Sequence, residues 1–100
     1  MTDDEMFINQ IEFKLRAAKK DYETAKALFE RVKDTDIKQL RKEATWAVDL
    51  GEEAVEYLRI ALAEGRRTRK AEKFDAVGTT CHQGCGENIE RVVAALEGGK

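Results

Sequence analysis

The sequence predicts an all-α fold: a long antiparallel helical hairpin plus a shorter third helix, assembled as a dimeric helical bundle. Charged residues make up 38% of the 100 residues and proline is absent, a composition typical of long helices. Apolar residues recur with a helical period along the first two-thirds of the chain and again near its end. A chain of this length and composition is expected to form a single domain, residues 1–100.

The first helix is predicted over residues 4–33. The carboxylates of Asp3, Asp4 and Glu5 suit the positive end of a helix dipole. The apolar residues that follow alternate steps of three and four, a period of about 3.5 that is typical of a coiled coil. This seam consists of Ile8, Ile11, Leu15, Ala18, Tyr22, Ala25, Phe29 and Val32.

The second helix is predicted over residues 36–64, with Asp34, Thr35 and Asp36 available to cap it. So short a connection makes the two helices antiparallel. Many residues of its seam are small, which favours close packing. The helix either ends at Gly65 or continues as a solvated extension. The seam consists of Ile37, Leu40, Ala44, Ala47, Val48, Gly51, Ala54, Val55, Leu58, Ala61 and Leu62.

A second apolar face on this helix comprises Trp46, Leu50, Tyr57 and Ile60. A helix with two apolar faces has neighbours on two sides. We therefore expect this face to pack in part on the third helix and in part on another molecule.

The third helix is predicted over residues 80–97, because Thr80 and Gln83 form a capping-box pattern. Such a helix would cover only part of the hairpin, which leads to the prediction of a two-fold homodimer with the third helices outside. The end, residues 98–100, is expected to be flexible. The apolar stripe of this helix consists of Val77, Cys81, Cys85, Ile89, Val92, Val93 and Leu96.

Charge and composition also limit the location and the partners. The net charge of −2 gives no overall attraction to nucleic acid or to an anionic membrane. The acidic start does not resemble a secretory signal, and no apolar run is long enough to span a membrane. With only two cysteines, we expect a cytoplasmic protein with reduced thiols.

Cys81, His82 and Cys85 provide soft ligands at helical spacing and suggest a zinc site or a thiol switch. A closed zinc site needs four ligands, so a second protomer or carboxylates would have to complete it. Alternatively, both cysteines pack as small apolar side chains. Metal binding, a disulfide and simple packing all remain open at this stage.

Two pairs of carboxylates three residues apart, Glu53 with Glu56 and Glu72 with Asp75, suggest an enzyme. This pattern resembles the motifs of the all-α nucleotide pyrophosphohydrolases of the MazG-like group. The resemblance implies that the four carboxylates hold Mg²⁺ against a nucleoside triphosphate, with the basic run from Arg66 to Lys70 near its phosphates. The alternative is a solvated helix face.

The basic run itself contains Arg66, Arg67, Arg69 and Lys70. Such a cluster can bind the phosphates of nucleic acid or an acidic protein surface. It lacks interleaved aromatic residues for base stacking, so we expect a protein partner rather than nucleic acid.

Together these patterns predict a non-catalytic protein-interaction module with no cofactor, acting as a small adaptor, regulator or inhibitor. A phage- or plasmid-encoded inhibitor would fit the size. No residue is assigned a catalytic role, because the sequence contains no complete nucleophile or metal motif. The predicted partner surface combines types that dominate interface energies and comprises Trp46, Leu50, Tyr57, Ile60, Arg66, Arg67, Arg69 and Lys70.

Overall fold

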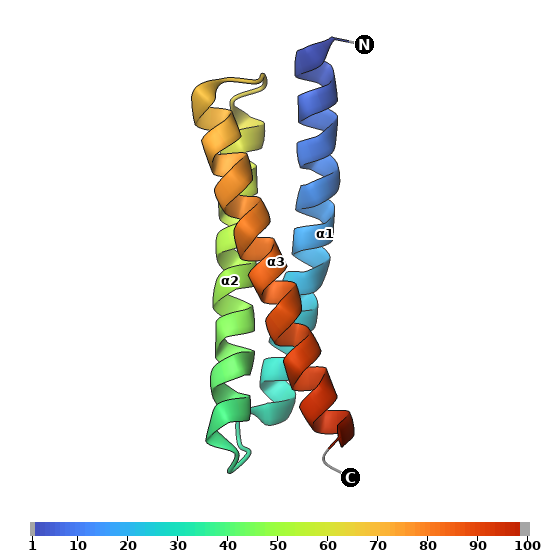
Figure 1. Cartoon of the computed structure of the whole chain (residues 1–100), viewed down its shortest axis with the longest axis vertical. Helices are drawn as coiled ribbons and strands as arrows, with labels where there is room; N and C mark the ends of the chain where they lie inside the picture. Colours follow the sequence, from blue (N-terminus) through green and yellow to red (C-terminus); the bar gives the residue numbers. More distant parts are fainter. Residues whose placement is uncertain (1, 99–100) are drawn as a thin grey trace.

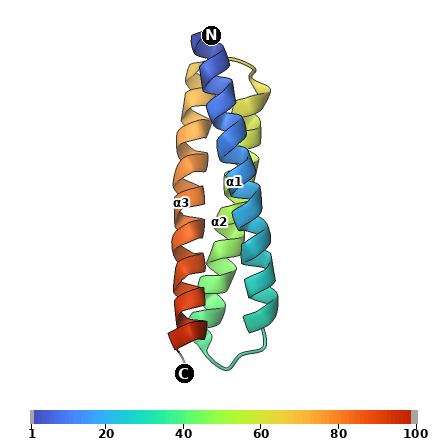
Figure 2. The same ribbon diagram turned by 90° about the vertical axis from the view of Figure 1, so that its right-hand side faces the viewer.

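The computed structural model describes residues 2–98 as an elongated three-helix bundle measuring 52 × 20 × 16 Å. The helices are α1 (Asp3–Val32), α2 (Lys38–Ala63) and α3 (Arg69–Gly98). In Figures 1 and 2 they run down, up and down, so α1 and α3 are parallel and α2 is antiparallel to both. The predicted all-α bundle is therefore confirmed. Gly99 and Lys100, part of the end expected to be flexible, lie outside the described residues.

Helix α1 begins where its acidic first turn predicts. The Thr2 hydroxyl accepts a hydrogen bond from the Glu5 N–H (3.1 Å) and caps the helix. The middle of the predicted seam is the buried side of the helix. At the two ends, Phe7 and Leu28 are more deeply buried than Ile8 and Phe29, which pack at the edges of the core. The buried residues of α1 are Phe7, Ile11, Leu15, Ala18, Ala25, Leu28 and Val32.

Helix α2 begins at Lys38, two residues later than predicted. Ile37 occupies the cap position and supplies no side-chain hydrogen bond. The Thr35 hydroxyl instead accepts from the Ile37 N–H (3.4 Å), and the Arg41 guanidinium donates to the Thr35 carbonyl. These contacts stabilise the turn rather than the helix end, so the predicted cap is wrong in its register.

Gly65 ends α2, which decides between the two alternatives for this segment. Its φ of +70° lies in the left-handed region, and among the described residues no non-glycine residue has a positive φ. Glycine adopts this conformation without a Cβ clash, and it is the usual residue after a helix C-terminus. The chain then turns back through residues 66–68 into α3.

Helix α3 begins at Arg69 rather than at residue 80, and the predicted shorter third helix is wrong. It has 30 residues, the same as α1. Its start is capped by the Thr68 hydroxyl, which accepts from the Ala71 N–H (3.0 Å). Thr80 lies inside the helix, where its hydroxyl donates to the Ala76 carbonyl (3.0 Å). The early turns bury the small residues Ala71 and Gly78, which give little signal in an apolar stripe.

The longer α3 covers the second apolar face of α2. Leu50 packs toward Gly84, where an added Cβ would lie 3.0 Å from Leu50 Cδ1. Tyr57 stacks on Phe74 with ring centroids 5.8 Å apart. The dimer prediction assumed that a short third helix leaves part of the hairpin uncovered. In the structure, α3 covers most of that surface.

Glycine sets the separation of α2 and α3. A Cβ on Gly78 would lie 2.8 Å from Leu58 Cγ, closer than packed carbon atoms approach one another. A Cβ on Gly51 would lie 3.1 Å from Tyr22 Cδ1 and 3.2 Å from Cys85 Sγ. The two helices can therefore lie this close only because these positions lack side chains.

Helices α1 and α3 share apolar clusters with α2, in which Val32 and Ala25 of α1 join Val92 and Cys85 of α3, and they also meet through charged side chains. Lys14 Nζ lies 2.9 Å from Asp75 Oδ1, and His82 Nε2 lies 2.6 Å from Asp21 Oδ2. Each pair joins residues 61 positions apart, which is the register of two parallel helices. The two pairs are seven residues apart on both helices, so they share one edge of the bundle.

Candidate functional site

The three soft ligands of the predicted zinc site face three different neighbours. The Cys81 thiol donates to Glu53 Oε2 on α2 at 3.7 Å, whereas His82 contacts Asp21 on α1. Cys85 is fully buried and lies beside Gly51. Both thiols are free. The structure therefore shows the two cysteines as packed, reduced side chains whose polar neighbours do not converge.

The surroundings of both thiols favour the protonated form. Burial, together with the nearby Glu53 carboxylate, raises the pKa of Cys81. Burial and the charge of Asp21 raise the pKa of Cys85 to about 11. A thiolate is the form that attacks electrophiles and binds metals. Neither cysteine is activated for such chemistry in this fold.

The four carboxylates of the predicted magnesium site are not brought together either. Glu53 faces Cys81, Glu72 lies 3.5 Å from the Arg67 guanidinium, and Asp75 pairs with Lys14. Glu56 lines a groove on another side of α2. Within residues 2–98, no group of three or more His, Cys, Asp or Glu side chains is arranged to hold a metal ion.

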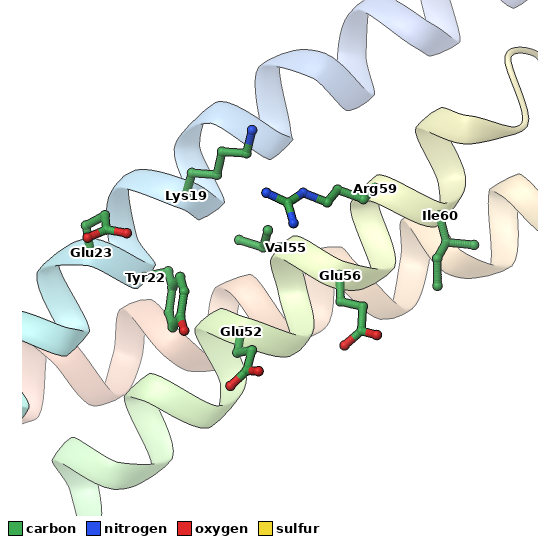
Figure 3. Close-up of a pocket in the computed structure, with 8 residues that line it drawn as sticks. All are labelled: Lys19, Tyr22, Glu23, Glu52, Val55, Glu56, Arg59 and Ile60. Atoms are coloured by element: carbon green, nitrogen blue, oxygen red, sulfur yellow. The ribbon is translucent and has the colours of Figure 1, made fainter.

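An open groove of about 820 Å³ lies between α1 and α2 (Figure 3). Arg59 reaches from α2 toward α1, while the carboxylates of Glu52 and Glu56 point away from it. Ligand pockets are normally enclosed and mainly apolar. This groove is open and carries charges of both signs, so it has the character of a solvated helix boundary. Its lining consists of Lys19, Tyr22, Glu23, Glu52, Val55, Glu56, Arg59 and Ile60.

The basic run predicted as a binding cluster is partly used inside the molecule. The Arg67 guanidinium lies 3.1 Å from Asp3, and the Arg67 backbone N–H donates to the Asp4 carboxylate (2.9 Å). Lys70 pairs with Glu64 at 3.3 Å. The acidic start of α1 therefore neutralises part of the α2–α3 connection, which reduces its attraction for phosphates. Arg66 and Arg69 remain exposed.

The predicted apolar partner face is reduced to one strongly exposed residue. Leu50, Tyr57 and Ile60 are half-buried, whereas the Trp46 side chain is 49% exposed. Tryptophan is among the residue types that contribute most to protein interfaces. Trp46 is therefore the member of this face that stays available to a partner.

A second exposed aromatic residue, Phe13, is absent from the predicted surface. It is 72% exposed on the outer side of α1, and Met6, seven residues earlier, is 50% exposed. Both lie outside the heptad seam, so a search for apolar periodicity passes over them. The sequence did contain a signal for this exposed surface: Phe13 and Met6 are large apolar residues at positions outside the seam, where polar residues are expected.

Comparisons with protein-family models, curated proteins and solved structures return no match for this chain. None of the described helices combines the length and apolar character needed to cross a lipid bilayer.

Proposed function

We propose that this chain is a non-catalytic helical interaction module that binds protein partners through exposed aromatic side chains. The observation that carries the proposal is the exposure of Phe13 and Trp46 on a bundle whose core is otherwise filled. Leaving a large aromatic side chain in water forgoes about 1.5–3 kcal/mol of burial free energy. Docking against a partner recovers part of it, and aromatic residues are frequent interface anchors.

Several features support a binding role over catalysis. Burial raises the pKa of both thiols, the carboxylates are dispersed, and the groove between α1 and α2 is open. Catalytic sites instead bring perturbed titratable groups together in a cleft. A rigid bundle that presents fixed surfaces fits an adaptor, a regulator or an inhibitor.

Site-specific photo-crosslinking tests this proposal. A photoreactive amino acid is placed at position 13 or position 46, and the protein is irradiated in the cells that produce it. We expect discrete protein adducts from both positions. The exposed positions 30 and 38, on charged helix faces, serve as controls and should give little product. Equal adduct patterns from all four positions would contradict the proposal.

A further inference from the structure

Along α1, the charged residues one and two turns away from Phe13 are all basic. Its neighbours one and two turns away on α1 include two basic residues, Arg16 and Lys20, and no carboxylate. Acidic residues number 20 in this chain, so a neighbourhood without one is distinctive. The full set of neighbours is Met6, Asn9, Gln10, Arg16, Ala17 and Lys20. We call this surface the Phe13 patch.

Along α2, the neighbours of Trp46 have the opposite character. Glu43 and Asp49 lie three residues on either side of the indole, and Glu53 lies seven residues beyond it. Lys42 is the one basic residue at the same spacing. We call this acidic surface the Trp46 patch. Each patch therefore combines an exposed aromatic residue with a rim of mainly one sign of charge.

Four of the rim charges take part in no ion pair within the described molecule, although Glu43 accepts a hydrogen bond from Gln39 (3.1 Å). Among residues 2–98, the ion pairs leave out Arg16, Lys20, Glu43 and Asp49. Phe13 and Trp46 also stay exposed in the folded bundle, so one chain does not cover either patch with the other. Pairing the patches requires two molecules.

We propose that this chain associates with a second copy of itself, head to tail, with the Phe13 patch of one molecule on the Trp46 patch of the next. Arg16 and Lys20 then face Glu43 and Asp49 across the contact, and the two aromatic side chains are buried together. Aromatic anchors inside a complementary charged rim are the usual anatomy of a specific interface.

The pairing joins two different surfaces, so the interface is heterologous. Each molecule in the contact keeps one unused patch, which allows further copies to add. The inference rests on the proposed function, because it names a second copy as a partner of the same exposed aromatic residues. It differs from a two-fold dimer, in which a single patch would contact itself.

Charge reversal combined with sedimentation velocity tests the inference. Wild type is expected to sediment faster as its concentration rises, and the fluorescence of Trp46 should shift to the blue as the indole becomes covered. R16E/K20E and E43K/D49K should each weaken the association at least about tenfold. F13S should abolish the blue shift although it leaves Trp46 in place.

Mixing the two charge-reversed variants is the decisive step. Reversed patches are complementary to each other, so the mixture should regain association within about threefold of wild type. Matched controls reverse exposed charges elsewhere: K38E/K73E for the basic pair and D34K/D36K, in the α1–α2 connection, for the acidic pair. Both controls should associate like wild type.

A monomeric wild type, equal weakening by the controls, or failure of the mixture to recover would each overturn the inference. Photo-crosslinking at positions 13 and 46 can still yield adducts with proteins other than this chain, whichever of these results is obtained. Failure of head-to-tail pairing is therefore distinguishable from failure of the proposed function.

Discussion

Helix α3 packs against its two neighbours in different ways. Against α2 it uses close apolar contact, with Gly78 under Leu58 and the Tyr57 ring stacked on Phe74. Against α1 it adds charged pairs at the edge of the shared apolar core, such as Lys14 with Asp75 at 2.9 Å. Glycine permits the first arrangement, and long side chains span the second.

The difference indicates where the stability of the bundle resides. Buried apolar contacts are worth several kcal/mol each when lost, whereas partly exposed ion pairs are worth about 1 kcal/mol or less. We therefore expect the α2–α3 seam to dominate unfolding. The charged edge between α1 and α3 sets the register of the parallel helices and contributes little to the free energy.

The largest effect should come from Leu58→Ala, which removes the side chain at the centre of the seam. Leu58 is fully buried, so the substitution should lower the free energy of unfolding by about 3 kcal/mol. Urea denaturation monitored by circular dichroism measures this. Ile37→Ala, at a residue that is 59% exposed, is the control and should change stability by less than about 0.5 kcal/mol. A similar fall in the free energy of unfolding in both variants would contradict the claim that the α2–α3 seam dominates stability.

The free energy of unfolding should fall at high pH because of Cys85. Burial raises the pKa of its thiol from an ordinary value of 9.0 to about 11 in the folded protein. Because the folded state holds this proton more tightly, the stabilisation is complete below pH 9 and is lost as pH rises toward 11. The expected loss is about 2 kcal/mol. Cys85→Ala should show a flatter stability curve over this range, and parallel curves would refute the claim.

Glycine substitutions in α3 sharpen the comparison, because two positions differ only in their surroundings. Gly78→Ala should lower stability by about 1–2 kcal/mol, since its Cβ would meet Leu58. Gly86 has open space around a built Cβ, so Gly86→Ala should raise stability by about 0.5–1 kcal/mol through helix propensity. Thermal unfolding would show opposite shifts, and shifts of one sign would count against the packing argument.

The smallest effect is expected at the charged edge. A double-mutant cycle with Lys14→Gln and Asp75→Asn should give a coupling free energy of about 0.5–1 kcal/mol, reduced by salt. Both side chains are partly exposed, at 35% and 19%, which limits the interaction. A coupling as large as the loss from Leu58→Ala would reverse the ranking of the two interfaces.

The predictable part of the molecule is the part with large apolar residues at helical spacing. Ile11, Leu15 and Leu58 repeat with a clear period, so the hairpin of α1 and α2 could be predicted, whereas the end of α2 at Gly65 stayed open. The first turns of α3 could not, because their buried positions are Ala71 and Gly78, and small residues do not stand out in a hydrophobic pattern. The helix consequently appeared shorter than it is.

The candidate site was predictable only in part for a related reason. The half-burial of Tyr57 depends on the early turns of α3, where Phe74 stacks on it, and those turns were not predicted. The ion pairs of Arg67 with Asp3 and of His82 with Asp21 depend on the register of two helices far apart in sequence. Spacing along one helix does not carry that information, so the predicted metal clusters were assembled from residues that face different neighbours.

The most direct test of the central claim is Gly78→Ala measured in the Leu58→Ala background. If the Leu58 side chain is what excludes a Cβ at position 78, shortening the leucine to alanine makes room for the new methyl group. The substitution that destabilises the wild-type protein should then become neutral or stabilising by up to about 1 kcal/mol in equilibrium unfolding. An equal loss in both backgrounds would contradict the claim that this close contact defines the α2–α3 seam.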